Sequence, residues 1–147
     1  MKIIQGNLIT EAQSNHFDVI IHGCNCFCTM GAGIAKDIKR AFPEAYKADI
    51  ATRNGDRSKL GTYSSATIGN LTVLNAYTQY EYGKSRINVS YDAIQKVFCQ
   101  IKRDFTGKRI GYPAIGAGLA GGDWKRIYAI ICDELQNEDH TFVEYQK

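Results

Sequence analysis

The segment Asn25-Cys-Phe-Cys-Thr-Met-Gly-Ala-Gly33 follows an apolar run over 19–22 and precedes a run over 34–42 whose apolar residues recur at helical spacing. A second segment, Gly116-Ala-Gly-Leu-Ala-Gly-Gly122, lies in the same way between the runs 109–115 and 124–131. Glycine lets a backbone approach a ligand closely, and the first N–H groups of a helix attract an anion. Two such turns, with almost no reactive side chain between them, predict a site that wraps a diphosphate-containing small molecule.

The hydrophobic pattern around these segments alternates strands with helices. Strands are predicted over 2–5, 17–22, 62–68, 71–77, 108–112 and 141–145, and helices over 34–42, 44–53, 89–105 and 123–136. The continuous apolar run 17–22 is typical of a strand covered on both faces, and Gly69-Asn70 predicts a hairpin. Residues 56–59 are predicted to continue an exposed loop. The alternation predicts one α/β domain over 1–147, with a mixed β-sheet between helices.

The composition excludes several classes of protein. The 147 residues are 44% hydrophobic and 22% charged, which is ordinary for a globular chain and argues against disorder. No apolar run approaches the roughly 20 residues of a membrane span, and the first residues lack the apolar stretch of a signal peptide. Five cysteines without an export signal predict a reduced, cytoplasmic protein with no membrane partner, and we expect a monomer.

The net charge of +3 is mild. Small basic clusters at 36–40 and 102–109 are interspersed with acidic residues, which is more typical of solvated helix faces than of a nucleic-acid surface. A slightly positive protein also favours an anionic small-molecule substrate.

Several segments resemble the macrodomain family, whose members bind ADP-ribose in a three-layer α/β/α fold. The similarity runs from Gly6-Asn-Leu-Ile9 to the last strand, through Asp18-Val-Ile-Ile-His-Gly-Cys-Asn25, Gly31-Ala-Gly-Ile-Ala35 and Pro113-Ala-Ile-Gly-Ala-Gly-Leu-Ala-Gly-Gly122. The subgroup that contains yeast ADP-ribose 1''-phosphate phosphatase is most similar, because it shares His-x-Cys-Asn-Cys at 22–26, Phe-Pro at 42–43 and Phe-Val-x-Tyr-Gln at 142–146.

The resemblance implies a task for each segment. Asn25 touches the distal ribose, the loop Gly31–Gly33 encloses it, and the amides of the second segment hold the diphosphate. Asn7 replaces an aspartate that contacts the adenine amino group in many macrodomains, and its amide oxygen can still accept that bond. The expected ligand-binding residues are Asn7, Leu8, Gly23, Asn25, Met30, Gly31, Ala32, Gly33, Ile34, Ile115, Gly116, Ala117, Gly118, Leu119, Ala120 and Gly121.

The resemblance also bears on the reaction. Glutamate-linked ADP-ribose hydrolases of this superfamily use a lysine after the central strand and an aspartate in the diphosphate loop, where this chain has Gln79 and Ala120. Neither side chain can form or resolve a covalent adduct with the ribose, although Lys84 lies nearby as a substitute. The expected reaction is therefore hydrolysis of ADP-ribose 1''-phosphate to ADP-ribose and phosphate. Removal of ADP-ribose from protein or nucleic acid, and binding without turnover, are the alternatives.

Three side chains are candidates for catalysis, and each has a structural alternative. His22 has a pKa suited to proton transfer near neutral pH, or it is a buried histidine bonded to a neighbouring strand. Asn25 orients the ribose hydroxyl groups, or it caps the turn after the strand. Asp123 acts as an acid or base, or serves only as the N-cap of the last helix.

The remaining conspicuous residues are interpreted as packing. Cys24, Cys26 and Cys28 alternate like metal ligands, but no second pair of ligands accompanies them, so we expect no metal and no cofactor. Tyrosines 77, 80 and 82 either flank the ligand or pack at a strand end. Trp124 is expected to pack the last helix onto the sheet.

Overall fold

The structure, a computed structural model, describes residues 2–82, 88–118 and 120–146. Within these residues, strands form one sheet in the order β1-β6-β5-β2-β4-β3. The strands are β1 (Lys2–Gly6), β2 (Val19–Cys24), β3 (Tyr63–Ile68), β4 (Leu71–Tyr77), β5 (Ile110–Tyr112) and β6 (His140–Tyr145). Neighbouring strands are parallel except for β3 and β4, which form the hairpin predicted at Gly69-Asn70. The prediction of a mixed sheet is confirmed.

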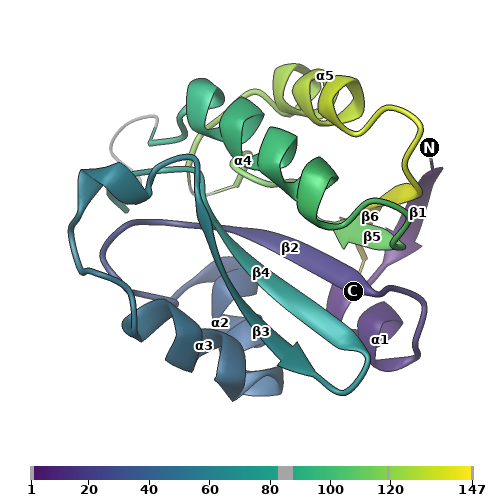
Figure 1. The fold of residues 1–147 in the computed structure, drawn as a ribbon, viewed down its shortest axis with the longest axis horizontal. Coiled ribbons are helices and arrows are strands. Elements are labelled where there is room, and N and C mark those ends of the chain that lie inside the picture. The colour runs from purple at the N-terminus through teal and green to yellow at the C-terminus, as the bar shows by residue number, and fades with distance from the viewer. Residues whose placement is uncertain (1, 83–87, 119, 147) are drawn as a thin grey trace.

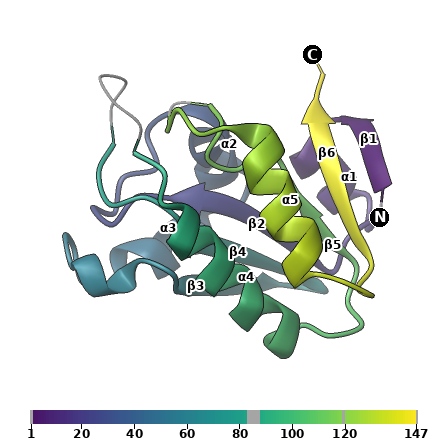
Figure 2. The ribbon, with the colours of Figure 1, turned by 90° about the horizontal axis from the view of Figure 1, so that it is seen from above.

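Helices cover both faces of the sheet. They are α1 (Leu8–Gln13), α2 (Gly33–Ala41), α3 (Pro43–Ile50), α4 (Tyr91–Asp104) and α5 (Trp124–Glu134), with a short 3-10 helix η1 (Arg57–Lys59). In Figure 1, α4 and α5 lie above the sheet and α1, α2 and α3 lie below it. Figure 2 shows α4 and α5 from above, side by side over the strands. Because helices cover both faces of the sheet, the protein has the expected three-layer α/β/α arrangement.

Strand β2 lies at the centre of both halves of the core. Val19 and Ile21 pack with α4 and α5, while Ile20 packs on the opposite face with α1, α2 and α3. All three side chains are at most 1% exposed. The apolar run therefore forms a strand covered on both faces, as its sequence predicts.

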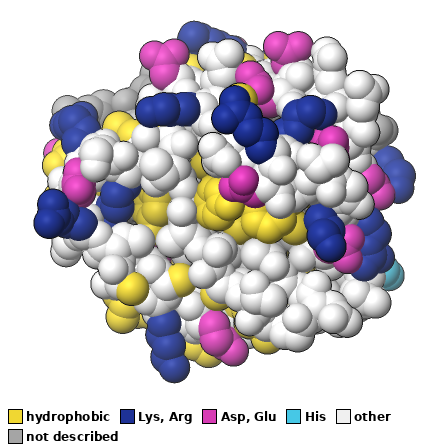
Figure 3. All heavy atoms as spheres, viewed as in Figure 1, with side chains coloured by type: hydrophobic (Ala, Val, Ile, Leu, Met, Phe, Trp, Pro, Cys, Tyr) yellow, Lys and Arg dark blue, Asp and Glu magenta, His cyan; other side chains and the backbone are white. Residues whose placement is uncertain are grey.

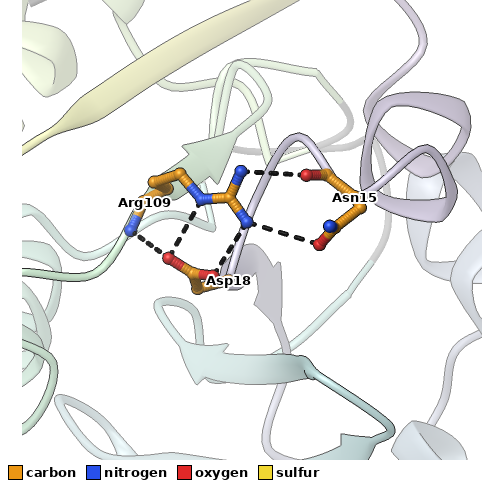
Figure 4. A network of polar contacts seen from close by, with 3 residues as sticks. All are labelled: Asn15, Asp18 and Arg109. Atoms are coloured by element: carbon orange, nitrogen blue, oxygen red, sulfur yellow. Dashed lines mark hydrogen bonds and ion pairs between the residues drawn. The ribbon is translucent and has the colours of Figure 1, made fainter.

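The parallel strands bring their carboxyl ends to one edge of the sheet, which we call the carboxyl edge. The opposite amino edge is held by Arg109, just before β5, and Asp18, just before β2 (Figure 4). The Asp18 carboxylate accepts bonds from the Arg109 backbone N (2.8 Å), Nε (3.1 Å) and Nη2 (2.9 Å). Arg109 Nη1 also donates to the Asn15 carbonyl at 2.9 Å. These hydrogen bonds to the arginine lower the pKa of Asp18.

Some local predictions need correction. Helix α1 is missing from the predicted elements, because six residues are too few to show a helical period. The prediction that 56–59 continue an exposed loop was wrong in part, since 57–59 form η1 and Lys59 is only 8% exposed, although Arg57 and Ser58 are exposed. Helix α4 begins at Tyr91 because Ser90 caps it, and Val89 instead forms a β-bridge with Gln79.

The surface agrees with the mild net charge. Figure 3 shows basic and acidic side chains interspersed over the face seen in Figure 1, with apolar side chains visible between them. In the part of the chain that the structure describes, no helix is long and apolar enough to cross a membrane.

Candidate ligand-binding site at the carboxyl edge

Three loops converge at Gly23, near the end of β2. A Cβ added to this glycine would lie 2.8 Å from Thr78 Oγ1, 3.1 Å from Ile115 Cγ2 and 4.0 Å from the Gly116 nitrogen. Such contacts leave no room for a side chain, so glycine is required by the close approach. The structure thus brings together the first loop (residues 25–33), the second loop (residues 113–122) and the segment after β4.

The Asn25 side chain organises the first loop. Its Oδ1 accepts a bond from the Phe27 backbone N at 2.8 Å, and its Nδ2 donates to Thr29 Oγ1 at 2.7 Å. This is the turn-capping arrangement that sequence analysis weighed against ribose binding. Because a carbonyl oxygen has two lone pairs, Oδ1 retains one for a hydroxyl group. The geometry allows both tasks.

The first loop leads into a helix without a side-chain cap. Ala32 occupies the N-cap position of α2 and makes no capping hydrogen bond, whereas Asn7, Ser90 and Asp123 cap α1, α4 and α5 with their side chains. Met30 is buried, while residues 31–33 are exposed and Ile34 is half-buried. The first amides of α2 are therefore available to an anion at the carboxyl edge.

The second loop uses part of its backbone amides internally. The N–H groups of Ile115, Ala117, Gly121 and Gly122 donate to carbonyl groups at 113, 114, 118 and 116 respectively. In the backbone hydrogen bonds between described residues, the N–H groups of positions 116, 118 and 120 have no acceptor. Among the described residues of the loop, these amides and that of Ala114, which also has no backbone acceptor, are the ones available to an anion.

Side chains of the second loop differ in exposure. Ile115 and Ala120 are 2% and 4% exposed and contribute to the core, so they support the loop from within. Gly118 is exposed, and Leu119 lies outside the described residues. The Ala120 carbonyl accepts the Asn88 N–H at 2.8 Å, which ties the second loop to the segment before α4.

His22 lies in the core. It is 0% exposed, and its Nε2 is 2.7 Å from Asn75 Oδ1. Asn75 Nδ2 donates to the Ala45 carbonyl and to Ser64 Oγ, so its oxygen faces the histidine and the ring proton belongs on Nε2. Burial lowers the pKa of His22 to about 4, despite the opposing effect of the Asn75 bond. The arrangement is the buried alternative that sequence analysis gave for this residue.

Asp123 caps α5, as predicted. Its Oδ1 accepts the Lys125 N–H at 3.1 Å, and its own backbone N–H donates to the Tyr91 hydroxyl at 3.0 Å. The residue is exposed at the end of the second loop. Its carboxylate therefore has a structural task and is also open to solvent.

The cysteines and aromatic residues mostly pack. Cys24 and Cys26 are buried, and burial raises the pKa of both thiols. The described residues contain no group of three side chains placed to hold a metal ion. Tyr77 is 1% exposed and donates to Asp49 Oδ1 at 2.7 Å, so its side chain packs at the end of β4 and is not open to a ligand. The Trp124 ring lies 4.6 Å from that of Phe142 in β6, so this residue packs α5 onto the sheet as predicted.

Two further residues complete the edge near β1. Asn7 Oδ1 accepts the N–H groups of Ile9 (3.0 Å) and Thr10 (3.1 Å), so this oxygen caps α1. Tyr145 pairs with Gly6 in the sheet and its side chain is 67% exposed. Tyr145 is not among the expected site residues, because only the fold shows that this aromatic residue is exposed beside the start of α1. An exposed ring at this position offers a surface for stacking.

Two hollows in the described surface lie away from these loops. One of about 570 Å³ runs along α5 beside Arg126 and Cys132. Another, of about 350 Å³, lies at the amino edge beside Asp18 and Arg109. Lys84, the substitute nucleophile considered from sequence, falls outside the described residues.

Known proteins are similar to this chain over most of its length. A protein of Enterobacteria phage T4, described only as an uncharacterized 17.5 kDa protein, is 37% identical over 89% of this chain and 87% of its own. An ADP-ribose 1''-phosphate phosphatase of Debaryomyces hansenii is 35% identical over 74% of this chain and 57% of its own. A DNA ADP-ribosyl glycohydrolase of Thermus aquaticus is 25% identical over 92% of this chain and 38% of its own. The chain thus spans little more than half, or less, of the two enzymes.

Solved structures agree on the fold. A protein from Bacteroides thetaiotaomicron superposes with a TM-score of 0.80 at 21% identity, and 99% of each chain is covered. Thermosipho africanus DarTG in complex with ADP-ribose superposes with a TM-score of 0.73 at 16% identity, over 99% of this chain and 41% of its own. The Macro domain family matches residues 21–131, and the chain therefore belongs to the macrodomain family.

Proposed function

We propose that this macrodomain binds ADP-ribose 1''-phosphate across the carboxyl edge and hydrolyses it to ADP-ribose and phosphate. The observation that carries the proposal is the uncapped start of α2, which follows the loop organised by Asn25. A helix start of this kind suits a phosphate at the distal end of the ligand. The similarity to the Debaryomyces phosphatase supports the same reaction.

The order of the strands gives the ligand a direction. Along the sheet, β1 and β6 are followed by β5 and then β2. The exposed Tyr145 ring, in β6 beside β1, suits the adenine, whereas the side-chain oxygen of Asn7 is occupied by the cap of α1. The second loop after β5 offers amides to the diphosphate, and the first loop after β2 offers Asn25 to the distal ribose. An extended ADP-ribose that lies across the carboxyl edge therefore places its adenine, its diphosphate and its distal ribose at these groups in turn.

The chemistry needs a water molecule at phosphorus and donors to the phosphoryl oxygens. As water attacks, the bond from phosphorus to the ribose oxygen breaks, and that oxygen leaves with a proton. Backbone N–H groups at the start of α2 can stabilise the negative charge during this step. We assign His22 to the support of the core, through its bond to Asn75 in β4, and not to proton transfer, because its ring is enclosed and uncharged at neutral pH. Of the three candidates for catalysis, Asp123 is then the one with an exposed carboxylate that can relay a proton.

A second reaction is favoured by a different observation. Aromatic residues lie beside Asn25 in the first loop and after β4, and Tyr82 among them is 63% exposed. They offer a surface to a larger group attached to the distal ribose. Release of ADP-ribose from a modified macromolecule is therefore the second candidate, and the similarity to the Thermus glycohydrolase supports it.

A substrate panel tests the proposal. We expect the wild-type protein to release phosphate from ADP-ribose 1''-phosphate, and Asn25→Ala to lose both ADP-ribose binding and turnover. Asp123→Asn keeps an oxygen for the helix cap but cannot exchange a proton, so a loss of turnover with unchanged binding would identify Asp123 as the relay. If the folded protein binds ADP-ribose but releases no phosphate, the phosphatase proposal is wrong. Release of ADP-ribose from a modified oligonucleotide or peptide would then select the second reaction.

A further inference from the structure

Cys28, in the middle of the first loop, has a left-handed backbone conformation with φ of 55°. The other non-glycine residues with positive φ in the described part of the chain are Asn15 and Asn137, and asparagine tolerates this conformation better than most residues do. For cysteine the conformation is unfavourable, and it persists only where the surroundings hold it. Contacts of Cys28 must therefore maintain the turn.

The turn at Cys28 shapes the part of the loop that faces the proposed ligand. Asn25 bonds to both sides of it, since Oδ1 accepts the Phe27 N–H at 2.8 Å and Nδ2 donates to Thr29 Oγ1 at 2.7 Å. After the turn, Met30 enters the core on the face covered by α1, α2 and α3, and the chain then leads into the uncapped start of α2. The conformation of Cys28 therefore decides how Asn25 and the start of α2 lie relative to each other.

The Cys28 side chain joins the loop to the end of α3. Its thiol donates to the Asp49 carbonyl at 3.3 Å and lies 3.5 Å from Thr52 Oγ1. Lys59, in η1, donates from Nζ to the same sulfur at 3.7 Å and to Thr52 Oγ1 at 2.9 Å. The last carbonyl groups of a helix lack partners within it, and an ammonium stabilises their negative charge. The lysine thus holds both the helix end and the sulfur that is bonded to it.

Lys59 is an unusual residue for a packing position. It is 8% exposed, and it belongs to none of the ion pairs between described residues. Burial raises the pKa of the nearby Asp49 carboxyl, while a bond from Tyr77 and the Lys59 ammonium act in the opposite direction. A buried charge without a direct ion pair is unfavourable, and an apolar side chain of the same length would fill the space without desolvating a charge. Packing alone therefore does not account for a lysine here.

We propose that Lys59 is a positioning residue for the ligand site, which holds Cys28 in the left-handed conformation and thereby aligns Asn25 with the start of α2. The inference rests on the proposed binding of ADP-ribose 1''-phosphate, and it adds a residue that does not touch the ligand. The ammonium fixes the sulfur, the sulfur fixes the backbone turn, and the turn places the groups that meet the distal ribose and its phosphate. Without this lysine the loop also populates other conformations, and the ligand must select the competent one.

The test separates the conformation of Cys28 from the charge of Lys59. Lys59→Met removes the ammonium and keeps the length of the side chain, and Lys47→Met removes an equal charge from an exposed position in the last turn of α3. Cys28→Ala and Cys28→Gly both remove the sulfur, but only glycine adopts a positive φ without strain. The double variant Lys59→Met/Cys28→Gly completes the set. KM and kcat are measured per folded molecule for phosphate release from ADP-ribose 1''-phosphate, and the Kd of ADP-ribose is measured by calorimetry where no phosphate is released.

We expect Lys59→Met and Cys28→Ala to raise KM, or Kd, by about 5- to 30-fold with kcat nearly unchanged. This factor corresponds to the roughly 1–2 kcal/mol by which the left-handed conformation is disfavoured for an L-residue. It falls on KM because saturating ligand selects the competent loop. Cys28→Gly should stay close to the wild type, and it should restore the KM of Lys59→Met. Lys47→Met should behave as the wild type.

Other results overturn the inference. Equal losses in Cys28→Ala and Cys28→Gly would show that the sulfur contacts matter and the conformation does not. A loss in Lys59→Met that glycine does not restore would show that the charge acts directly, and an unchanged KM in Lys59→Met would show that the lysine only packs. If Lys59→Met does not fold, the pair of Cys28 variants, which retain the lysine, decides in the same way. Failure of the wild type to bind either ligand would instead overturn the proposed function.

Discussion

At the scale of the residue, burial decides what His22 can do. The ring is enclosed on all sides and its Nε2 is bonded to Asn75 in the neighbouring strand β4. Desolvation disfavours the charged imidazolium, and this effect exceeds the stabilisation that Asn75 provides. A histidine that sequence analysis considered for proton transfer is thus held neutral inside the core.

The depressed pKa of His22 predicts a pH-dependent stability. Because the folded pKa is about 4 and the ordinary value is 6.5, the unfolded chain binds this proton more readily. The destabilisation is absent above pH 6.5, grows as the pH falls to about 4, and reaches roughly 3 kcal/mol. His22→Gln cannot titrate, so its free energy of unfolding should fall less steeply over this range in urea titrations. His140, whose pKa is also lowered by burial, is present in both proteins and cancels in the comparison.

The same variant separates support from catalysis. In His22→Gln, the introduced amide would keep a donor for Asn75 but would supply no group able to exchange a proton near neutral pH. We expect His22→Gln to retain turnover per folded molecule. If the free energy of unfolding changes with pH equally in both proteins, and His22→Gln loses turnover, His22 is a catalytic residue.

At the scale of the element, the second loop depends on glycine at particular positions. Gly116 has φ of 74°, and a Cβ there would lie 2.6 Å from Val89 Cγ2. Gly118 has no heavy atom within 4 Å of an added Cβ. A side chain is therefore opposed by the backbone and by its neighbours at Gly116, whereas there is room for one at Gly118.

A matched pair of alanine substitutions tests this difference. Gly116→Ala should destabilise the protein by about 1–3 kcal/mol, because the backbone conformation and the space both oppose a side chain. Gly118→Ala should change the free energy of unfolding by less than about 0.5 kcal/mol. Thermal or urea unfolding of the two variants gives the comparison. Equal losses of unfolding free energy in the two variants would show that the loop does not need glycine at position 116 for its conformation.

Elements with a long hydrophobic pattern were predictable from the sequence, whereas short ones were not. The continuous apolar run 17–22 predicted a buried strand, the pattern over 89–105 predicted a long helix, and the hairpin followed from its turn. Helix α1 and η1 have too few residues for a period, and Lys59 is buried by contacts that no local pattern contains. That the two glycine-rich loops lie close together was predictable because parallel strands end at one edge. The sequence left two alternatives open for His22 and did not predict the exposure of Tyr145, because both depend on which strands become neighbours.

At the scale of the whole molecule, the sheet separates the site from the interactions that hold its far end. The loops of the proposed site and the start of α2 lie at the carboxyl edge. The amino edge carries the Asp18–Arg109 network, which joins the segments that lead into β2 and β5 (Figure 4). Since both loops of the proposed site follow these two strands, the network stabilises the scaffold without contributing a side chain to that site.

This separation predicts opposite effects of substitutions at the two edges. Asp18→Ala removes a carboxylate that accepts three bonds from Arg109, and should lower the free energy of unfolding by about 1 kcal/mol once solvent screening is included. Because the pKa of Asp18 is lowered from 3.8, this stabilisation is present above that pH and is lost as the pH falls through the folded value. ADP-ribose affinity, measured by calorimetry on the folded protein, should not change. Asn25→Ala should instead lose that affinity at a smaller cost in stability, and a loss of affinity in Asp18→Ala would show that the two edges are coupled through β2.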